Sequence, residues 1–293
     1  MQYIRTLIFY FIALCLATLM VCSGSDGGKI MAVNDSLSLS VFAGSSLIIF
    51  AMQWLAFIPA YLFKTEHFYD LTGSITYISV VIFAALQSPP LDIRSIILVC
   101  LIGVWAARLG SFLFLRVVKQ GSDSRFDEIK HNFWRFSITW TLQGLWVLMT
   151  AGAAFAAITS GHQREFGIMG SVGLIVWSIG FAYEVIADNQ KQQFRKQNNS
   201  NTDFIQTGLW SRSRHPNYFG EILVWLGVAI IAYPALYQWQ LITLISPIFV
   251  AFLLIRVSGV PQQQKQAEQR WKDNQNYQEY KASTPVLIPK LFK

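Results

Sequence analysis

Charged residues are scarce in this chain of 293 residues. Asp, Glu, Lys and Arg make up 13% of it, while hydrophobic residues make up 53%. Soluble domains carry about 25% charged residues, so this low density indicates a surface that faces lipid. The mean hydropathy of +0.39 agrees with that interpretation. The deficit excludes an ordinary soluble domain and predicts an integral membrane protein.

Several familiar binding motifs are also missing. The three cysteines have neither metal-ligand spacing nor the pattern of a disulfide framework, and no metal site is expected. There is no glycine-rich dinucleotide fingerprint, P-loop or serine nucleophile elbow, so any nucleotide must be held by the ends of membrane helices. No internal repeat is present, which disfavours an inverted-repeat transporter.

Apolar segments divide the chain into candidate membrane spans, each of which needs about 20 residues to cross the hydrocarbon. They cover residues 4–22, 36–62, 72–87, 95–117, 136–159, 167–189, 219–234 and 239–257. The third and seventh are short, so they are tilted, re-entrant or paired as a hairpin. The expected fold class is all-α, a polytopic transmembrane helix bundle of about seven to eight spans with a short C-terminal tail.

Three parts are expected along the chain. Residues 1–30 form a transmembrane helix or a signal-like segment with a Gly/Ser linker, and the helix is favoured. Residues 31–260 form the transmembrane bundle, and residues 261–293 form a tail with a helix and an extended end. Nineteen of the 23 Lys and Arg residues fall on one side of these spans, with the N-terminus. The positive-inside rule makes that side cytoplasmic, so the net charge of +7 indicates topology and no nucleic-acid partner.

A charged stripe marks the end of the sixth span. Glu184, Asp188, Lys191 and Arg195 are spaced so that all four share one helix face. Ion pairs that stabilise a helix end would explain this spacing. Acids at the membrane boundary are costly, however, and usually functional, so we favour a site.

The next segment combines a helix start with basic residues. Pro216 suits the first turn of a helix, whose free N–H groups would lie beside Arg212, Arg214 and His215. Amides, a positive dipole end and guanidinium groups together favour phosphate. An interfacial cluster that reaches toward lipid headgroups is the alternative.

Asn217 and Glu221 would share one face of the same helix. A basic cluster that only reaches toward lipid headgroups would not explain a carboxylate at Glu221, directly before an apolar run. Together with the basic residues, these side chains predict a cofactor pocket on the cytoplasmic side.

Polar residues within other spans are weaker signals. Arg108 is an intramembrane charge that needs a partner, for example Glu184 or Glu221. Gln53 and Gln143 either bond neighbouring helices or serve a site. The loop at residues 121–126, which contains Asp123 and Arg125, is either a solvated turn or a cover for a nucleotide.

At these residues the sequence resembles the bacterial branch of the steroid 5α-reductase-like membrane family, whose superfamily includes sterol reductases and isoprenylcysteine carboxyl methyltransferases. The likeness covers roughly residues 40–293. It is densest in Trp105-x-x-Arg108, Gly121-x-Asp123-x-Arg125, Ala187-Asp188-Asn189-Gln190 and Ser213-Arg214-His215-Pro216-Asn217-Tyr218-Phe219-Gly220-Glu221.

The resemblance implies a helix bundle that binds NADPH from the cytosol and passes hydride to the β-carbon of a conjugated enone. The expected cofactor-binding residues are Arg108, Asp123, Arg125, Glu184, Asp188, Lys191, Arg195, Arg212, Arg214, His215, Asn217, Tyr218 and Glu221. The protein's own task would be placement and electrostatic support.

The substrate side departs from the family's pattern. Steroid reductases carry a Gln-Glu pair on the second span and a Tyr nearby; here Gln53 is followed by Trp54, and Trp105 occupies the Tyr region. Tyr183, Tyr218 and His215 are left as alternative proton donors. The candidate catalytic residues are Gln53, Tyr218 and His215.

Three functions follow in order of preference. The first is an NADPH-dependent reductase of a C=C bond in a lipophilic, steroid- or isoprenoid-like substrate. The second is an S-adenosylmethionine-dependent methyltransferase, which the clustered arginines disfavour because a methyl donor carries no phosphate. The third is a non-catalytic lipid-binding protein. The expected location is a bacterial inner membrane with the C-terminus and cofactor site cytoplasmic, and the expected partners are the substrate and membrane lipids.

Overall fold

The computed structural model describes residues 2–34, 36–123, 125–162, 164–197 and 203–290. Within them, eight helical segments are long and apolar enough to cross a membrane, which confirms the predicted all-α polytopic bundle. These segments are Thr6–Ser25, Val41–Leu62, Tyr69–Leu86, Ile93–Lys119, Phe133–Thr159, Gly167–Gln197, Pro216–Ala235 and Gln238–Trp271. Ser124, in the loop expected to cover a nucleotide, lies outside the described residues.

The chain packs as two compact units. Unit 1 comprises Met1–Gly170 and Ala229–Ser246, and unit 2 comprises Ser171–Val228 and Pro247–Lys293. The boundaries predicted near residues 30 and 260 divide the chain by its expected course through the membrane, whereas the two units are defined by packing. Those boundaries stay predictions.

Helix α5 is the centre of unit 1. It runs over Phe133–Thr159, and α1 (Gln2–Ser25), α2 (Val41–Leu62) and α3 (Tyr69–Leu86) all pack against it. Its apolar window is 83% buried, against 22–44% for α1, α2, α3 and α4 (Ile93–Gln120). Small residues explain this central position, because they let neighbouring helices approach closely. A Cβ on Gly152, for example, would lie 2.2 Å from Cε of Met20.

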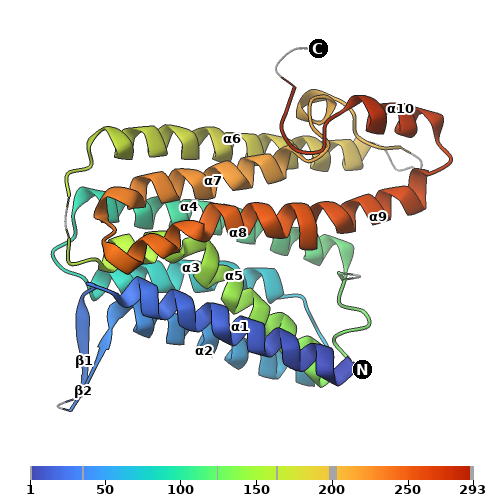
Figure 1. Cartoon of the computed structure of the whole chain (residues 1–293). Helices are drawn as coiled ribbons and strands as arrows, with labels where there is room; N and C mark the ends of the chain where they lie inside the picture. Colours follow the sequence, from blue (N-terminus) through green and yellow to red (C-terminus); the bar gives the residue numbers. More distant parts are fainter. Residues whose placement is uncertain (1, 35, 124, 163, 198–202, 291–293) are drawn as a thin grey trace. The chain divides into compact units, whose positions relative to one another are not determined.

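A short β-hairpin joins α1 to α2 (Figure 1). Strand β1 (Ile30–Asn34) pairs antiparallel with β2 (Leu37–Ser40). Oδ1 of Asn34 accepts from the backbone N–H groups of Ser36 and Leu37, which forms the turn. The second span was predicted to begin at residue 36, and that start is wrong. Helix α2 begins only at Val41, where Oγ of Ser40 caps it by accepting from N of Ala43 at 3.0 Å.

Arg94 ties together three segments of unit 1. It is fully buried at the start of α4, and its guanidinium donates to the backbone carbonyls of Ile231, Arg164 and Glu165. The guanidinium therefore satisfies carbonyl groups that the helix ladders leave without a donor.

Unit 2 is built around α6 (Gly167–Gln197) and α7 (Pro216–Ala232), whose backbones touch at glycines. A Cβ on Gly220 would lie 2.6 Å from both N of Glu184 and O of Gly180, and a Cβ on Gly227 would lie 2.6 Å from N of Trp177. Only residues without a side chain permit this approach. It brings the start of α7 against the charged stripe of α6.

The C-terminal part of unit 2 is more helical than expected. After the 3₁₀ segments Tyr233–Ala235 and Gln238–Ile245 come α8 (Ser246–Phe252), a π-helical turn (Leu253–Val257), α9 (Gly259–Trp271) and α10 (Gln275–Ser283). The predicted tail start at Pro261 falls in the first turn of α9, where proline is tolerated. Residues 284–290 then run without helix, as the predicted extended end requires.

Candidate functional site

The acids of the α6 stripe are buried, while its basic residues are not. Glu184 and Asp188 are 3% and 8% exposed, whereas Lys191 is half-buried and Arg195 exposed. The helix is continuous from Gly167 to Gln197, as the spacing predicted. The stripe therefore leads from buried carboxylates to basic side chains at the helix end.

Helix α7 begins at Pro216, as predicted, and its first turn meets the stripe. Nδ2 of Asn217 donates to Oδ1 of Asp188 at 3.3 Å. Gly220, directly before Glu221, touches the backbone at Glu184. The structure thus packs the first turns of α7 against the acidic face of α6.

The connection from α6 to α7 is fixed on α6. Gly208 has a left-handed φ of 62°, and a 3₁₀ turn (Gly208–Ser211) follows. Oε1 of Gln190 accepts from N of Leu209 at 2.9 Å, and Nε1 of Trp210 donates to O of Ala187 at 3.0 Å. Nζ of Lys191 lies 4.8 Å from the centre of the Trp210 ring, within cation–π range.

His215 and Tyr218 form a stacked pair at the start of α7. Their ring centres are 5.3 Å apart with the planes 13° from parallel. Burial lowers the pKa of His215 to about 3, and the nearby charges of Lys191 and Arg214 add to that effect. The imidazole is therefore neutral at pH 7 and adds no positive charge at the start of α7.

Arg212 and Arg214 provide the positive charge in this connection. Arg212 is exposed, whereas Arg214 is half-buried, and its buried Nε has no hydrogen-bond partner among the described residues. A buried guanidinium N–H that lacks an acceptor is costly, and a phosphate oxygen would satisfy it.

The C-terminal segment holds this connection in place, which sequence reasoning did not anticipate. The hydrogen bonds that join the two include Tyr280 Oη to Trp210 O (2.6 Å), Ser213 Oγ to Leu287 O (2.7 Å), Arg214 N to Pro285 O (2.9 Å) and Lys290 N to Arg212 O (3.0 Å). The only sequence signal for this segment was the family likeness, which extends to residue 293.

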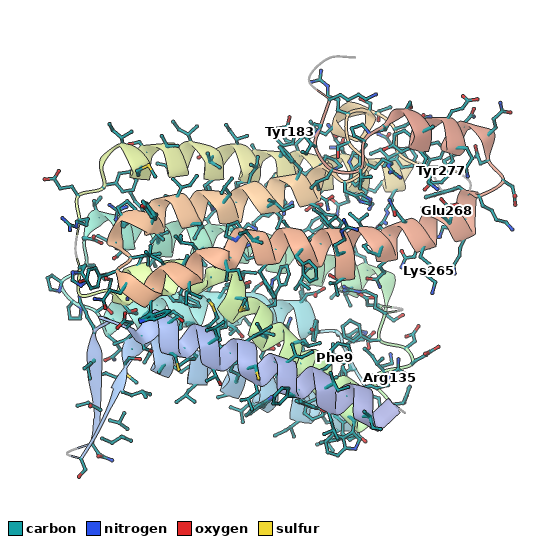
Figure 2. All side chains as sticks on the ribbon, in the orientation of Figure 1. Phe9, Arg135, Tyr183, Lys265, Glu268 and Tyr277 are labelled. Atoms are coloured by element: carbon teal, nitrogen blue, oxygen red, sulfur yellow. The ribbon has the colours of Figure 1, made fainter. Side chains whose placement is uncertain are left out.

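An aromatic cluster anchors the same segment. Phe204 contacts the rings of Trp271, Tyr277 and Tyr280 at centre distances of 5.8, 5.3 and 5.4 Å. Figure 2 shows Tyr277 and Glu268 in this part of unit 2, where α10 follows α9, and Glu268 forms an ion pair with Lys281.

Four predicted site residues belong to unit 1: Gln53, Arg108, Asp123 and Arg125. Asp123 and Arg125 pair with each other at 2.5 Å, and Asp70 lies 3.7 Å from Arg125. Burial raises the pKa of Asp123, but the hydrogen bonds and charge of Arg125 outweigh it and hold that pKa below its ordinary value. This pair stabilises the turn, and its role toward a cofactor stays a prediction.

The two indoles of the substrate side lie in different environments. Trp54 is 53% exposed and donates from Nε1 to Oγ1 of Thr141 at 3.2 Å, so most of its surface is turned away from the protein interior. Trp105 is buried, and its ring packs edge-on at 5.2 Å against Tyr77 of α3. The buried hydroxyl of Tyr77, which the sequence did not single out, forms a hydrogen bond with Oγ1 of Thr150.

Arg108 lies on α4, with its guanidinium carbon 5.2 Å from the centre of the Phe112 ring. Its pairing with Glu184 or Glu221 stays a prediction. No group of three or more His, Cys, Asp or Glu residues with metal-binding geometry is present in the described ranges.

The fold is a bundle of apolar spans. Where α6 ends and α7 begins, it carries buried acids, basic residues and a stacked pair of rings. These features define a polytopic membrane protein with a polar site. Residues 56–284 match the family described as "Protein of unknown function (DUF1295)", and the chain belongs to this family, which is steroid 5α-reductase-like. The predicted family resemblance is confirmed at that level.

Two curated relatives are similar over part of their length. The Delta(14)-sterol reductase ERG24 of Saccharomyces cerevisiae is 31% identical over 134 residues, which cover 42% of this chain and 29% of that protein. An uncharacterised protein of Schizosaccharomyces pombe is 28% identical over 120 residues, which cover 34% and 35%. The chain therefore spans about a third of the length of each relative. No solved structure matches the chain.

Proposed function

We propose that this protein is a membrane-embedded, NADPH-dependent reductase that reduces a C=C bond of a lipophilic substrate. Family membership and the likeness to a sterol reductase support a membrane reductase in general. The observation that carries the cofactor assignment is the buried Nε of Arg214, which has no hydrogen-bond acceptor among the described residues.

The residues of unit 2 fit the parts of NADPH by their chemistry. Arg212, Arg214 and Lys191 supply donors for phosphate oxygens. Asp188 and Asn217 supply the acceptor and donor that ribose hydroxyls or a carboxamide need. The parallel rings of His215 and Tyr218 offer an apolar face to a planar ring.

NADPH, when bound, supplies the hydride. The side chains then have three tasks: they bind the phosphates, orient the nicotinamide and keep water from the hydride. Asp188, buried with Glu184 on the α6 face, holds the amide of Asn217 in place, while the neutral His215 leaves positive charge to the arginines. The location we propose is a bacterial inner membrane, with this site on the cytoplasmic side that the Lys and Arg distribution indicates.

A ligand panel with purified full-length protein in detergent tests the proposal. We expect NADPH to raise the unfolding temperature more than NADH, and S-adenosylhomocysteine to leave it unchanged. Arg214→Gln should weaken the NADPH effect, whereas Arg270→Gln, at an exposed arginine of unit 2, should retain it. Stabilisation by S-adenosylhomocysteine alone would favour the methyltransferase, and co-purified phospholipid without any nucleotide response would favour a lipid-binding protein.

A further inference from the structure

The β1–β2 hairpin of unit 1 exposes apolar side chains at one end of the membrane spans. It joins the end of α1 to the start of α2. Its described residues, 30–34 and 36–40, contain no Asp, Glu, Lys or Arg. Ile30, Val33 and Leu37 are 70%, 52% and 54% exposed. Adjoining apolar side chains at a surface mark a site for a protein partner or for lipid.

The two faces of the hairpin differ in polarity. Met31 and Leu39 lie directly opposite each other, and Leu37 shares their face because side chains alternate along a strand. The other face carries two cross-strand pairs, Ala32 with Ser38 and Ile30 with Ser40. The face formed by Met31, Leu37 and Leu39, here called the apolar face, therefore has no polar side chain, whereas the opposite face carries two serines.

Met31 turns the apolar face toward the spans. A Cβ on Gly44 would lie 2.3 Å from Cε of Met31. Gly44 belongs to the span Val41–Leu62, so Met31 packs against the first turn of that span. Leu37 lies farther along the hairpin on the same face, and more than half of its surface is uncovered. The apolar face thus begins on α2 and continues beyond it without cover from the described residues.

The hairpin also runs sideways. Figure 1 shows β1 and β2 crossing the direction of α1 and α2 instead of continuing along it. Because α1 and α2 are membrane spans, a hairpin that crosses their direction follows the surface of the bilayer. Its apolar face is then turned toward the lipid and its serine-bearing face toward the water.

Hydrogen bonds fix the base of the hairpin. N of Lys29 donates to O of Thr159 at 2.7 Å, and N of Val41 donates to O of Lys29 at 2.9 Å. Nζ of Lys29 donates to O of Ser88 at 2.6 Å, so this cation is turned toward a protein carbonyl. The strands therefore leave the bundle from a fixed position.

Aromatic side chains mark the depth of that base. A Cβ on Gly27, shortly before β1, would lie 3.9 Å from Cδ1 of Tyr237, and Oδ2 of Asp26 accepts from N of Trp239 at 3.1 Å. Tyr237 and Trp239 are 45% and 66% exposed where the span Gln238–Trp271 begins. Exposed Tyr and Trp at span ends are typical of the boundary between lipid and water. The base of the hairpin therefore lies at the level of the lipid headgroups.

We propose that the β1–β2 hairpin is an interfacial anchor whose apolar face binds the phospholipid leaflet at this end of the spans. Lipid is the occupant because the apolar face is continuous with the lipid-facing side of α2, where Leu47 is 65% exposed. The headgroup region also contains water, which satisfies the free backbone groups of the strand edges as hydrocarbon cannot. The anchor does not depend on the proposed reductase activity.

The uncharged strands predict which lipids the hairpin binds. A basic segment needs anionic headgroups, whereas an uncharged apolar face binds through the area that it buries. The hairpin should therefore insert equally into zwitterionic and anionic bilayers.

Spin labels on the full-length protein in phosphatidylcholine vesicles test the proposal. Leu37→Cys and Ser38→Cys are labelled after the three native cysteines have been replaced by alanine. Residues 37 and 38 are both exposed but lie on opposite faces of β2, so Ser38→Cys is the matched control. The readout is the ratio of two collision rates of the label, with oxygen, which concentrates in lipid, and with a neutral nickel chelate in the water on both sides of the membrane.

We expect this ratio to be roughly 3-fold or more higher at residue 37 than at residue 38, because an interfacial element buries its apolar face about 5–10 Å deep. Replacing part of the phosphatidylcholine by phosphatidylglycerol should leave both ratios unchanged. Similar ratios at the two residues, with frequent nickel collisions at both, would place the hairpin in water and overturn the proposal.

Three other results would also overturn it. Spectral broadening by a second label near residue 37 would assign the apolar face to a second copy of this chain. Rare collisions with both reagents at residue 37 would show that protein covers it. A high ratio at residue 37 only with phosphatidylglycerol would require a charge that the described strands lack.

Discussion

Asn217 on α7 donates from Nδ2 to Oδ1 of Asp188 on α6, across 3.3 Å. These residues are separated by 28 others in the chain, yet their contact joins the two helices that carry most of the candidate cofactor residues. The hydrogen bond fixes the amide of Asn217, in the first turn of α7, against the buried carboxylate of α6.

Asp188→Asn should weaken NADPH binding roughly tenfold, because a charged acceptor forms a stronger hydrogen bond than a neutral one. The change is isosteric, so the unfolding temperature without ligand should move little. Titration of the purified protein with NADPH measures the effect, and Asp273→Asn, at an acid whose side chain is 88% exposed, is the control. Unchanged affinity in Asp188→Asn would remove this carboxylate from the site.

Gly220→Ala should lower the free energy of unfolding by about 2 kcal/mol, because overpacked contacts typically cost 1–3 kcal/mol. The added Cβ would lie 2.6 Å from backbone atoms of Glu184 and Gly180, which cannot move aside as a flexible side chain can. Gly103→Ala is the control, since nothing lies within 4 Å of its Cβ position. Unfolding in mixed detergent measures both, and equal stability of the two variants would contradict the close approach of α6 and α7.

His215 should make stability depend on pH below neutrality. Its folded pKa is about 3, against an ordinary value of 6.5, because burial disfavours the charged ring. As pH falls from about 6.5 toward 3, the unfolded chain binds a proton that the folded protein does not. The free energy of unfolding should therefore fall with decreasing pH, by up to about 1.4 kcal/mol per pH unit from this group.

His215→Gln removes that titration and should flatten the slope within this pH window. Unfolding curves at pH 4.5, 5.5, 6.5 and 7.5 give the comparison. Above pH 6.5 the histidine contributes no slope, because it is neutral in both states. The same slope in wild type and variant would show that the ring is not held neutral.

Tyr280→Phe should raise the dissociation constant for NADPH roughly 3- to 10-fold. The reason is that the connection from α6 to α7, which carries Arg212 and Arg214, loses one hydrogen bond. Its hydroxyl donates to O of Trp210 at 2.6 Å, and Trp210 precedes both arginines. Tyr277→Phe is the control on the same helix, with a ring in the same aromatic cluster. A fall in unfolding temperature without a change in NADPH affinity would give Tyr280 a purely structural role.

The sequence determined much of the architecture because membrane spans are local features. Length and apolarity alone decide whether a segment can cross the hydrocarbon, so eight spans were predicted and eight are present among the described residues. Pro216 fixed the start of α7 by the same kind of local rule. The charged stripe from Glu184 to Arg195 needed only the helical period. The family resemblance, confirmed by the match over residues 56–284, also depended on short motifs.

Only the tertiary structure decided which polar groups are satisfied. No spacing rule relates Gln53 to Gln143. For each of them the sequence allowed either a hydrogen bond to a neighbouring helix or a role in a site. The burial of Arg94 and the C-terminal contacts of residues 212–214 were equally unreadable, because each depends on carbonyl groups supplied by distant segments. Hydrogen bonding of a buried group is a property of its whole surroundings, and a linear pattern carries no record of them.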